Sequence, residues 1–225
     1  MFEVSTAWKS AFPGAHVGVL AMKDVTNPAR HAELENHKAE LEARLREQFK
    51  GQDRAALSSH PVLRVYNEYY KRFKKTYHVQ LQLESIVMKG RSIPSVASLV
   101  EAMFMAEVKN MLLTAGHDLD VLQLPLILDV SNGTENYTVM RGELQTLKPG
   151  DMFISDRAGI ISDVIYGPDQ RTQIRAGTRN VIFTVYAPAG IKEQAVVNHL
   201  QDMRDYVLVI APQAQEELLK VYGRD

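Results

Sequence analysis

The sequence predicts an α+β protein in which helices precede and follow a central run of short strands. Apolar residues recur at helical spacing through most of the first 110 residues. Short β-branched and aromatic segments follow up to residue 187, and residues 191–222 again have the pattern of helices. Elements grouped in this way are typical of α+β folds, because a parallel α/β sheet requires helices and strands to alternate.

The composition is that of a globular protein. The 225 residues are 45% hydrophobic and 24% charged, and there is no cysteine, so disulfides and thiolate metal sites are excluded. No apolar run reaches the roughly 18 residues of a membrane span, and no secretory signal is visible. We therefore expect a cytoplasmic protein that does not contact membranes. The net charge of −1 means that any RNA contact requires a local basic patch, and we expect no DNA partner.

The N-terminal quarter predicts one strand and one helix. Apolar and small residues alternate in residues 13–25, where Val17–Leu20 is expected as a strand. Asn27 and Pro28 are typical of a helix start, and Gly51 is typical of a helix end. Leucines recur at helical spacing between them, which predicts a helix over most of this segment.

Three further helices are expected before the strands. One follows Pro61 and ends in a basic run, and another spans about 95–110. Residues 77–90 fit either a strand or a helical face, and we favour a helix because Gly90 and the proline after it close a segment of helix length.

Five strand segments and a helical C-terminus complete the expected order. Turn residues separate the strand segments, which are 125–130, 135–140, 152–156, 160–167 and 180–187. Residues 191–222 predict a helix, a turn at Ala211–Pro212 and a second helix. No linker or repeat interrupts the chain, so we expect residues 1–225 to form a single domain.

The segment LLTAGHDLDVLQLPL, residues 112–126, places His117, Asp118 and Asp120 between apolar runs. These side chains either cap a turn or face a pocket. A divalent metal ion is a further possibility for this residue set. Common catalytic signatures are absent: there is no glycine-rich phosphate loop, no G-x-S-x-G and no H-E-x-x-H. We expect no metal and no cofactor.

The order of four segments, KGRSIP, SVASLVEAMFMAE, GHDLD and TRNVIFTVYA, resembles that of the B3/B4 domain of the phenylalanyl-tRNA synthetase beta subunit, here as a free-standing protein. The resemblance covers about residues 60–190, and the helical segments 27–51 and 191–222 are extensions of it. It implies a three-layer α+β domain with a β-sandwich of unusual topology.

In that family the domain contains an editing site that hydrolyses tyrosine from mischarged phenylalanine tRNA. A second site of this kind is useful because a pocket for phenylalanine rejects an added hydroxyl poorly. The resemblance therefore implies tRNA or aminoacyl-tRNA as the partner and an aminoacyl-tRNA deacylase as the activity. It also implies that His117 orients the attacking water. We expect His117 and Asp118 or Asp120 to line a cavity with the 162–167 turn and Thr178.

The chain departs from the family pattern at the pocket. Met103–Phe104 replaces a Thr-Asn pair, and Thr184 stands where the family has an acidic residue. The pocket can therefore have another ligand, and polar residues near the family positions are candidates to line it. The candidate substrate-binding residues are Glu84, Glu101, Glu107, Lys109, Asn110, Asp118, Asp120, Ser162, Asp163, Tyr166, Gly167, Thr178, Arg179 and Thr184. Each also has a structural explanation as a cap, a turn residue or part of a solvated helix face.

A basic run, RVYNEYYKRFKK at residues 64–75, makes Arg72, Lys74 and Lys75 candidate RNA contacts. The alternative is a helix C-terminus, where the helix dipole favours cations. Two functions remain open: a deacylase, and a binding module for tRNA, an aminoacyl end or a free small molecule. The sequence leaves the oligomeric state open.

Overall fold

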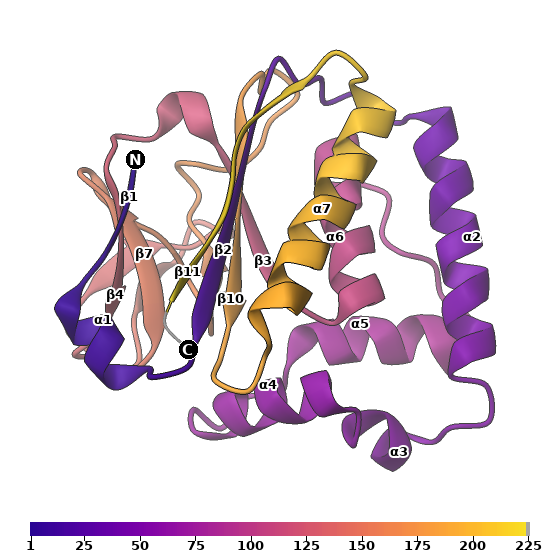
Figure 1. Cartoon of the computed structure of the whole chain (residues 1–225), viewed down its shortest axis with the longest axis horizontal. Helices are drawn as coiled ribbons and strands as arrows, with labels where there is room; N and C mark the ends of the chain where they lie inside the picture. The colour runs from indigo at the N-terminus through magenta and orange to yellow at the C-terminus, as the bar shows by residue number, and fades with distance from the viewer. Residues whose placement is uncertain (224–225) are drawn as a thin grey trace.

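The computed structural model describes residues 1–223 and confirms the α+β prediction. Its elements form three layers (Figure 1): a layer of helices, a central four-stranded sheet and an outer five-stranded sheet. Among residues 1–223, no helix combines the length and apolar character that a bilayer crossing requires.

The helical layer contains the predicted helices and one short helix, residues 54–58, that was not predicted. Its members are α2 (Ala32–Gln48), α3 (Arg54–Ser58), α4 (Pro61–Lys71), α5 (His78–Val87), α6 (Ser98–Asn110) and α7 (Glu193–Ile210), while the short α1 (Thr6–Ala11) lies beside the outer sheet. The ambiguous segment 77–90 is helical over His78–Val87, as we favoured. The start predicted at Asn27 is wrong: Asn27 Oδ1 instead accepts a hydrogen bond from Leu99 N, 3.0 Å away, and so satisfies a backbone donor in the first turn of α6.

The central sheet is antiparallel and has the order β11-β2-β10-β3. Its strands are β2 (His16–Lys23), β3 (Leu113–Asp118), β10 (Val181–Ala187) and β11 (Gln215–Gly223). A close approach fixes helix α7 on this sheet: a Cβ added at Gly18 would lie 2.6 Å from Val196 Cγ1. A glycine in β2 therefore allows α7 to pack directly on the strand.

The second C-terminal helix predicted within 191–222 is wrong, because residues 215–223 form strand β11. A turn at Ala211–Ala214 reverses the chain after α7, and β11 then pairs with β2 along most of its length. Backbone pairing with a neighbouring strand overrides the local helix preference of a segment that contains two Glu and two Leu residues.

The outer sheet has the order β1-β4-β7-β8-β9, and a small hairpin lies beside it. Its strands are β1 (Phe2–Val4), β4 (Leu126–Val130), β7 (Met152–Asp156), β8 (Gly159–Asp163) and β9 (Gly167–Pro168), and the hairpin consists of β5 (Asn136–Thr138) and β6 (Leu144–Thr146). A short 3₁₀ turn, Leu119–Val121, connects β3 to the loop before β4. One apolar core joins all three layers, from Leu63 of α4 through Val19 of β2 to Leu128 of β4.

Candidate functional site

A hollow of about 350 Å³ lies between helices α5 and α6, the edge strand β3 and the segment after β9. We call it the α5–α6 cleft. Its apolar wall is formed by Val100, Met103, Phe104, Met140, Pro168 and Ile174. Its polar groups come from His78, Gln82, Glu107, Thr114 and Gln173. A mostly apolar hollow with a few polar groups is the usual form of a small-molecule site.

Glu107 is the acidic residue of the cleft wall. It is 1% exposed, and its Oε1 accepts a hydrogen bond from Thr114 N at 2.8 Å. Burial raises the pKa of Glu107 to about 8. At neutral pH the carboxyl group is therefore mostly protonated, and it becomes an anion when a cation is placed beside it.

Thr114 of β3 connects the cleft to helix α7. Its hydroxyl oxygen lies 2.8 Å from Nε2 of His199, which is fully buried in the apolar stripe of α7. Nδ1 of His199 lies 3.3 Å from the Asn110 amide nitrogen, which donates to Asp202 Oδ2 at 2.8 Å. Burial lowers the pKa of His199 to about 4, so its imidazole is neutral at physiological pH.

The free edge of β3 forms the floor of the cleft at Gly116. The backbone N–H groups of Thr114 and Asp118 donate away from β10, to Glu107 Oε1 and to Thr172 O. Gly116 lies two residues from each of them in β3, so its N–H points to the same free edge. A Cβ at Gly116 would lie 2.8 Å from Ile174 Cδ1, so the missing side chain keeps the floor open.

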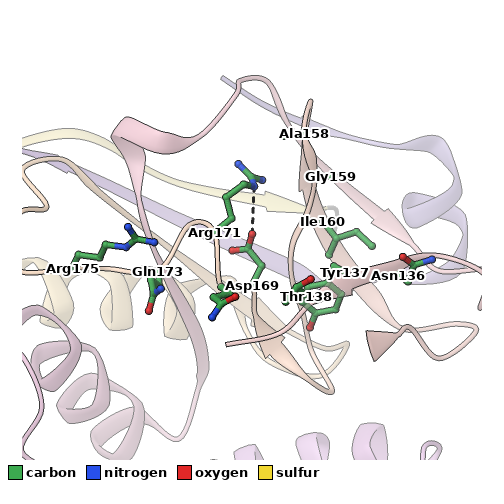
Figure 2. Close-up of a pocket in the computed structure, with 11 residues that line it drawn as sticks. Asn136, Tyr137, Thr138, Ala158, Gly159, Ile160, Asp169, Arg171, Gln173 and Arg175 are labelled. Atoms are coloured by element: carbon green, nitrogen blue, oxygen red, sulfur yellow. Dashed lines mark ion pairs between the residues drawn. The ribbon is translucent and has the colours of Figure 1, made fainter. Parts of the chain in front are cut away.

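A second, more polar hollow of about 480 Å³ lies across the segment that follows β9 (Figure 2). We call it the arginine pocket because Arg171 and Arg175 line it. Arg171 is held by Asp156, at 2.8 Å from Nη2, and by Asp169, at 3.6 Å from Nε. Figure 2 shows Arg175 beside Gln173. Gln173 lines both hollows, which are therefore neighbours.

Residues 117–120 (HDLD) form hydrogen bonds with the loop before β10 and line neither hollow. His117 is fully buried, and its Nδ1 lies 2.7 Å from the Thr172 hydroxyl. Burial lowers the pKa of His117 to about 3. Asp118 Oδ2 accepts from the Thr178 hydroxyl at 2.7 Å, and Asp120 accepts from an amide of the same loop at 2.6 Å. Asp118 and Thr178 therefore meet as expected, but His117 does not face the cavity that we expected.

Four further candidates form ion pairs or hydrogen bonds outside the cleft. Glu84 pairs with Arg54 at 3.0 Å, and Glu101 pairs with the buried Lys38 at 2.8 Å. Lys109 and Asn110 both contact Asp202 of α7, at 2.7 and 2.8 Å. Arg179 is exposed, and Thr184 is buried in β10 with its hydroxyl 3.5 Å from Ala115 O.

The candidates of the 162–167 turn meet one another in the outer sheet. Asp163 Oδ1 accepts hydrogen bonds from the backbone N–H of Tyr166 and Gly167 and from the Tyr137 hydroxyl. Ser162 Oγ lies 2.6 Å from the Tyr186 hydroxyl. These contacts fix the turn, and none of the turn's candidates lines the α5–α6 cleft.

The basic candidates lie at the end of α4. Arg72 donates to Gly150 O at 3.2 Å and packs on the Tyr69 ring, whereas Lys74 adopts a left-handed conformation with φ of 57°. Lys75 Nζ lies 5.4 Å from the centre of the Tyr166 ring. Tyr166 lines a small hollow together with Met140, a residue of the cleft wall, and Arg141.

Part of the cleft was predictable from the sequence. Glu107 was a candidate, and Met103–Phe104 were placed at the family's pocket positions; all three line the cleft. Thr114 and Gly116 were missed, because residues 113–118 were not predicted as a strand. The signal was present: Thr114 and Gly116 alternate with apolar or buried residues in MLLTAGHD.

Among residues 1–223, no cluster of three or more His, Asp or Glu side chains is arranged to hold a metal ion. No protein-family model matches the sequence, and no curated protein does. Among solved structures, the chain is similar to an N-terminal fragment of the phenylalanyl-tRNA synthetase beta subunit from Pyrococcus horikoshii, with 12% identity and a TM-score of 0.49. The alignment covers 97% of this chain and 54% of that one, so the chain spans about half of that fragment's length.

Proposed function

We propose that the α5–α6 cleft binds the aminoacyl end of a tRNA. The observation that carries the proposal is a mostly apolar cleft with the buried acid Glu107 in its wall. An aminoacyl group combines an apolar side chain with an α-ammonium group. The apolar wall matches the former, and the Glu107 carboxyl group matches the latter.

The size of the cleft supports a small occupant. Ligand pockets range over about 300–1,000 Å³, and the cleft, at about 350 Å³, lies at the lower end of that range. It therefore has room for one amino-acid-sized group, while the nucleotide that carries the group remains outside.

Cations lie near two residues of the cleft, Met140 and Gln173, and suit the phosphates of an attached RNA. Arg141 lines a small hollow with Met140 and Tyr166, and Lys75 Nζ lies 5.4 Å from the centre of the Tyr166 ring. Arg175 lines the arginine pocket together with Gln173. Local cations of this kind provide phosphate contacts even though the whole chain carries a net charge of −1.

The first experiment measures binding of non-hydrolysable aminoacyl-adenosine analogues, in which an amide replaces the 3′ ester. A panel that carries phenylalanyl, tyrosyl, leucyl and valyl groups is titrated by calorimetry against free amino acids. We expect the analogues to bind with a preference for the larger apolar groups. Equal or stronger binding of free amino acids would favour a free small molecule as the ligand.

A cleft-filling variant tests the location. Val100→Trp places an indole in the cleft wall and should weaken analogue binding at least tenfold. Val96→Trp is the matched control, because Val96 is 48% exposed and lines neither hollow. Equal affinities of the two variants would place the binding site elsewhere.

The RNA part of the ligand is tested by salt dependence. Each phosphate contact adds about 0.7–0.9 to the slope of log affinity against log salt concentration. Lys74→Ala with Lys75→Ala should therefore flatten the slope for tRNA, whereas Lys50→Ala with Lys192→Ala should leave it unchanged. Unaltered slopes for both variants would remove the end of α4 from the RNA-binding surface.

A further inference from the structure

We propose that Thr114 and His199 form a nucleophile–base pair that hydrolyses an acyl ester held in the α5–α6 cleft, an inference that rests on the proposed function of that cleft. The pair joins two elements that are far apart in sequence, β3 and α7. Thr114 Oγ1 and His199 Nε2 are 2.8 Å apart, which is the distance of a direct proton transfer. Thr114 also lines the cleft, which places this residue beside the bound group.

The position of His199 is unusual for a packing residue. The buried face of α7 otherwise consists of Val196, Leu200, Met203, Val207 and Ile210. An imidazole in such a stripe loses its hydration and requires polar partners in return. Nε2 lies 2.8 Å from the hydroxyl of Thr114, a residue that lines the cleft, and Nδ1 lies 3.3 Å from the Asn110 amide nitrogen.

The surroundings of His199 orient the ring for proton transfer. Burial lowers the pKa of His199 and Lys109 lowers it further, whereas the carboxylate of Asp202 and the carbonyl group of Ala106 favour the protonated imidazole. Lys109 also holds Asp202 at 2.7 Å. The proposed pair requires the ring proton on Nδ1, with the Asn110 amide nitrogen donating to Asp202 and not to the ring, so that the lone pair of Nε2 faces the Thr114 hydroxyl. This is the arrangement of a base that is oriented by further groups.

Gly116 supplies the group that stabilises negative charge. Its backbone N–H lies on the free edge of β3, two residues from Thr114, and Gly116 lines the cleft. A backbone donor at the site of attack stabilises the oxyanion that forms on the acyl carbonyl group. Nucleophile, base and oxyanion donor are therefore on or beside one strand.

The reaction is an acyl transfer in two steps. As Thr114 Oγ1 attacks the acyl carbon, its proton moves to His199 Nε2. The bond from that carbon to the ribose oxygen breaks, and the departing oxygen takes the proton, which leaves the acyl group on Thr114. A water molecule then attacks the same carbon and gives a proton to His199. The acid is released as the Thr114 oxygen regains that proton, so one ester and one water give one acid and one alcohol.

The test uses p-nitrophenyl 3-phenylpropionate as the probe, with p-nitrophenolate release and the intact mass of acid-quenched protein as readouts. We expect wild type to release p-nitrophenolate and to carry one phenylpropionyl group. Thr114→Val should lose the adduct and about 10²–10⁴-fold in rate, while Thr114→Ser should stay within tenfold of wild type.

A matched control exists elsewhere in the chain. Thr172 is also buried and also lies beside a histidine nitrogen, at 2.7 Å, but it lines neither hollow. Thr172→Val should therefore keep the rate and the adduct. A purely structural role of the Thr114 hydrogen bond predicts instead that both valine variants lose activity only in proportion to lost stability.

The pH profile tests His199 separately. Its pKa, lowered to about 4, leaves it neutral above pH 6. The wild-type rate should therefore be flat from pH 6 to 7, below the pKa of about 8 of Glu107, whose Oε1 accepts from Thr114 N. His199→Gln should be slow over the same range and should accelerate with pH as hydroxide replaces the base. The amide analogue separates the two proposals. Failure of wild type to bind it overturns the proposed function. Binding without turnover, or with wild-type turnover by Thr114→Val, overturns the nucleophile–base pair alone.

Discussion

Binding of an aminoacyl group should release a proton from Glu107. Burial raises the pKa of this carboxyl group to about 8, whereas an α-ammonium group in the cleft requires the carboxylate form. At pH 6.5 the group is protonated in about 97% of the molecules, and a ligand amine with a pKa of about 7.7–8.0 is almost fully charged. Forming the ion pair should therefore release about 0.9 proton per bound ligand.

The assay is calorimetric titration at pH 6.5 in two buffers that differ in ionisation enthalpy, here MES and imidazole. The observed enthalpy should depend on the buffer with a slope that corresponds to about 0.9 released proton. Two controls isolate Glu107. Glu107→Gln cannot ionise and should show almost no release, and an α-hydroxyacyl analogue lacks the ammonium group and should release none from wild type.

Equal enthalpies in both buffers for wild type and the ammonium-bearing analogue would refute this reasoning. They would mean that Glu107 keeps its proton in the complex and that the ammonium group binds elsewhere. Proton release that persists in Glu107→Gln would assign the effect to another group. Only loss of release in both controls agrees with direct pairing.

Two further predictions concern stability. Asp151 and Asp163 are buried near each other, and burial raises the pKa of Asp151 to about 8 and that of Asp163 to about 6. Because the folded state then holds protons that the unfolded state lacks, unfolding free energy should fall as pH rises, from about 4 to 8 for Asp151 and from about 4 to 6 for Asp163, by about 1.4 kcal/mol per pH unit for each such proton. Asp163→Asn should flatten that profile in urea unfolding at several pH values, and parallel profiles would contradict the assignment. His117→Ala should lower the unfolding free energy by about 2–4 kcal/mol, because it removes a buried ring and leaves the Thr172 hydroxyl without that partner. It should leave analogue affinity within threefold; loss of binding without loss of stability would instead give His117 a direct role.

The helices were predictable because their own sequences contain the necessary signals. Apolar residues at helical spacing identify α6, and Gly90 with Pro94 limits α5. Strand β11 was not predictable in the same way, since its structure depends on pairing with β2, about 200 residues earlier in the chain. Asn27 was misread for a similar reason, because the donor that it satisfies belongs to a distant helix.

The site was only partly predictable, because it depends on which residues of the short strand β3 face the cleft. Side chains alternate between the two faces of β3, so His117 lies on the opposite face from Thr114 and Gly116. His117, which stands out in the sequence, therefore contacts Thr172 in the loop before β10, whereas Thr114 lines the cleft. The contact of His199 with Thr114 could not be predicted from the sequence, since only the packing of α7 on β3 brings the two side chains to 2.8 Å.

The most direct test of the central claim, that the α5–α6 cleft holds the acyl group, is a ¹³C-methyl methionine NMR titration with the phenylalanyl-adenosine amide analogue. Met103 and Met140 line the cleft, whereas Met22 and Met203 are fully buried in the core away from it. We predict that the Met103 and Met140 methyl signals shift on saturation and that those of Met22 and Met203 do not. Unchanged Met103 and Met140 signals at saturating ligand would contradict the account.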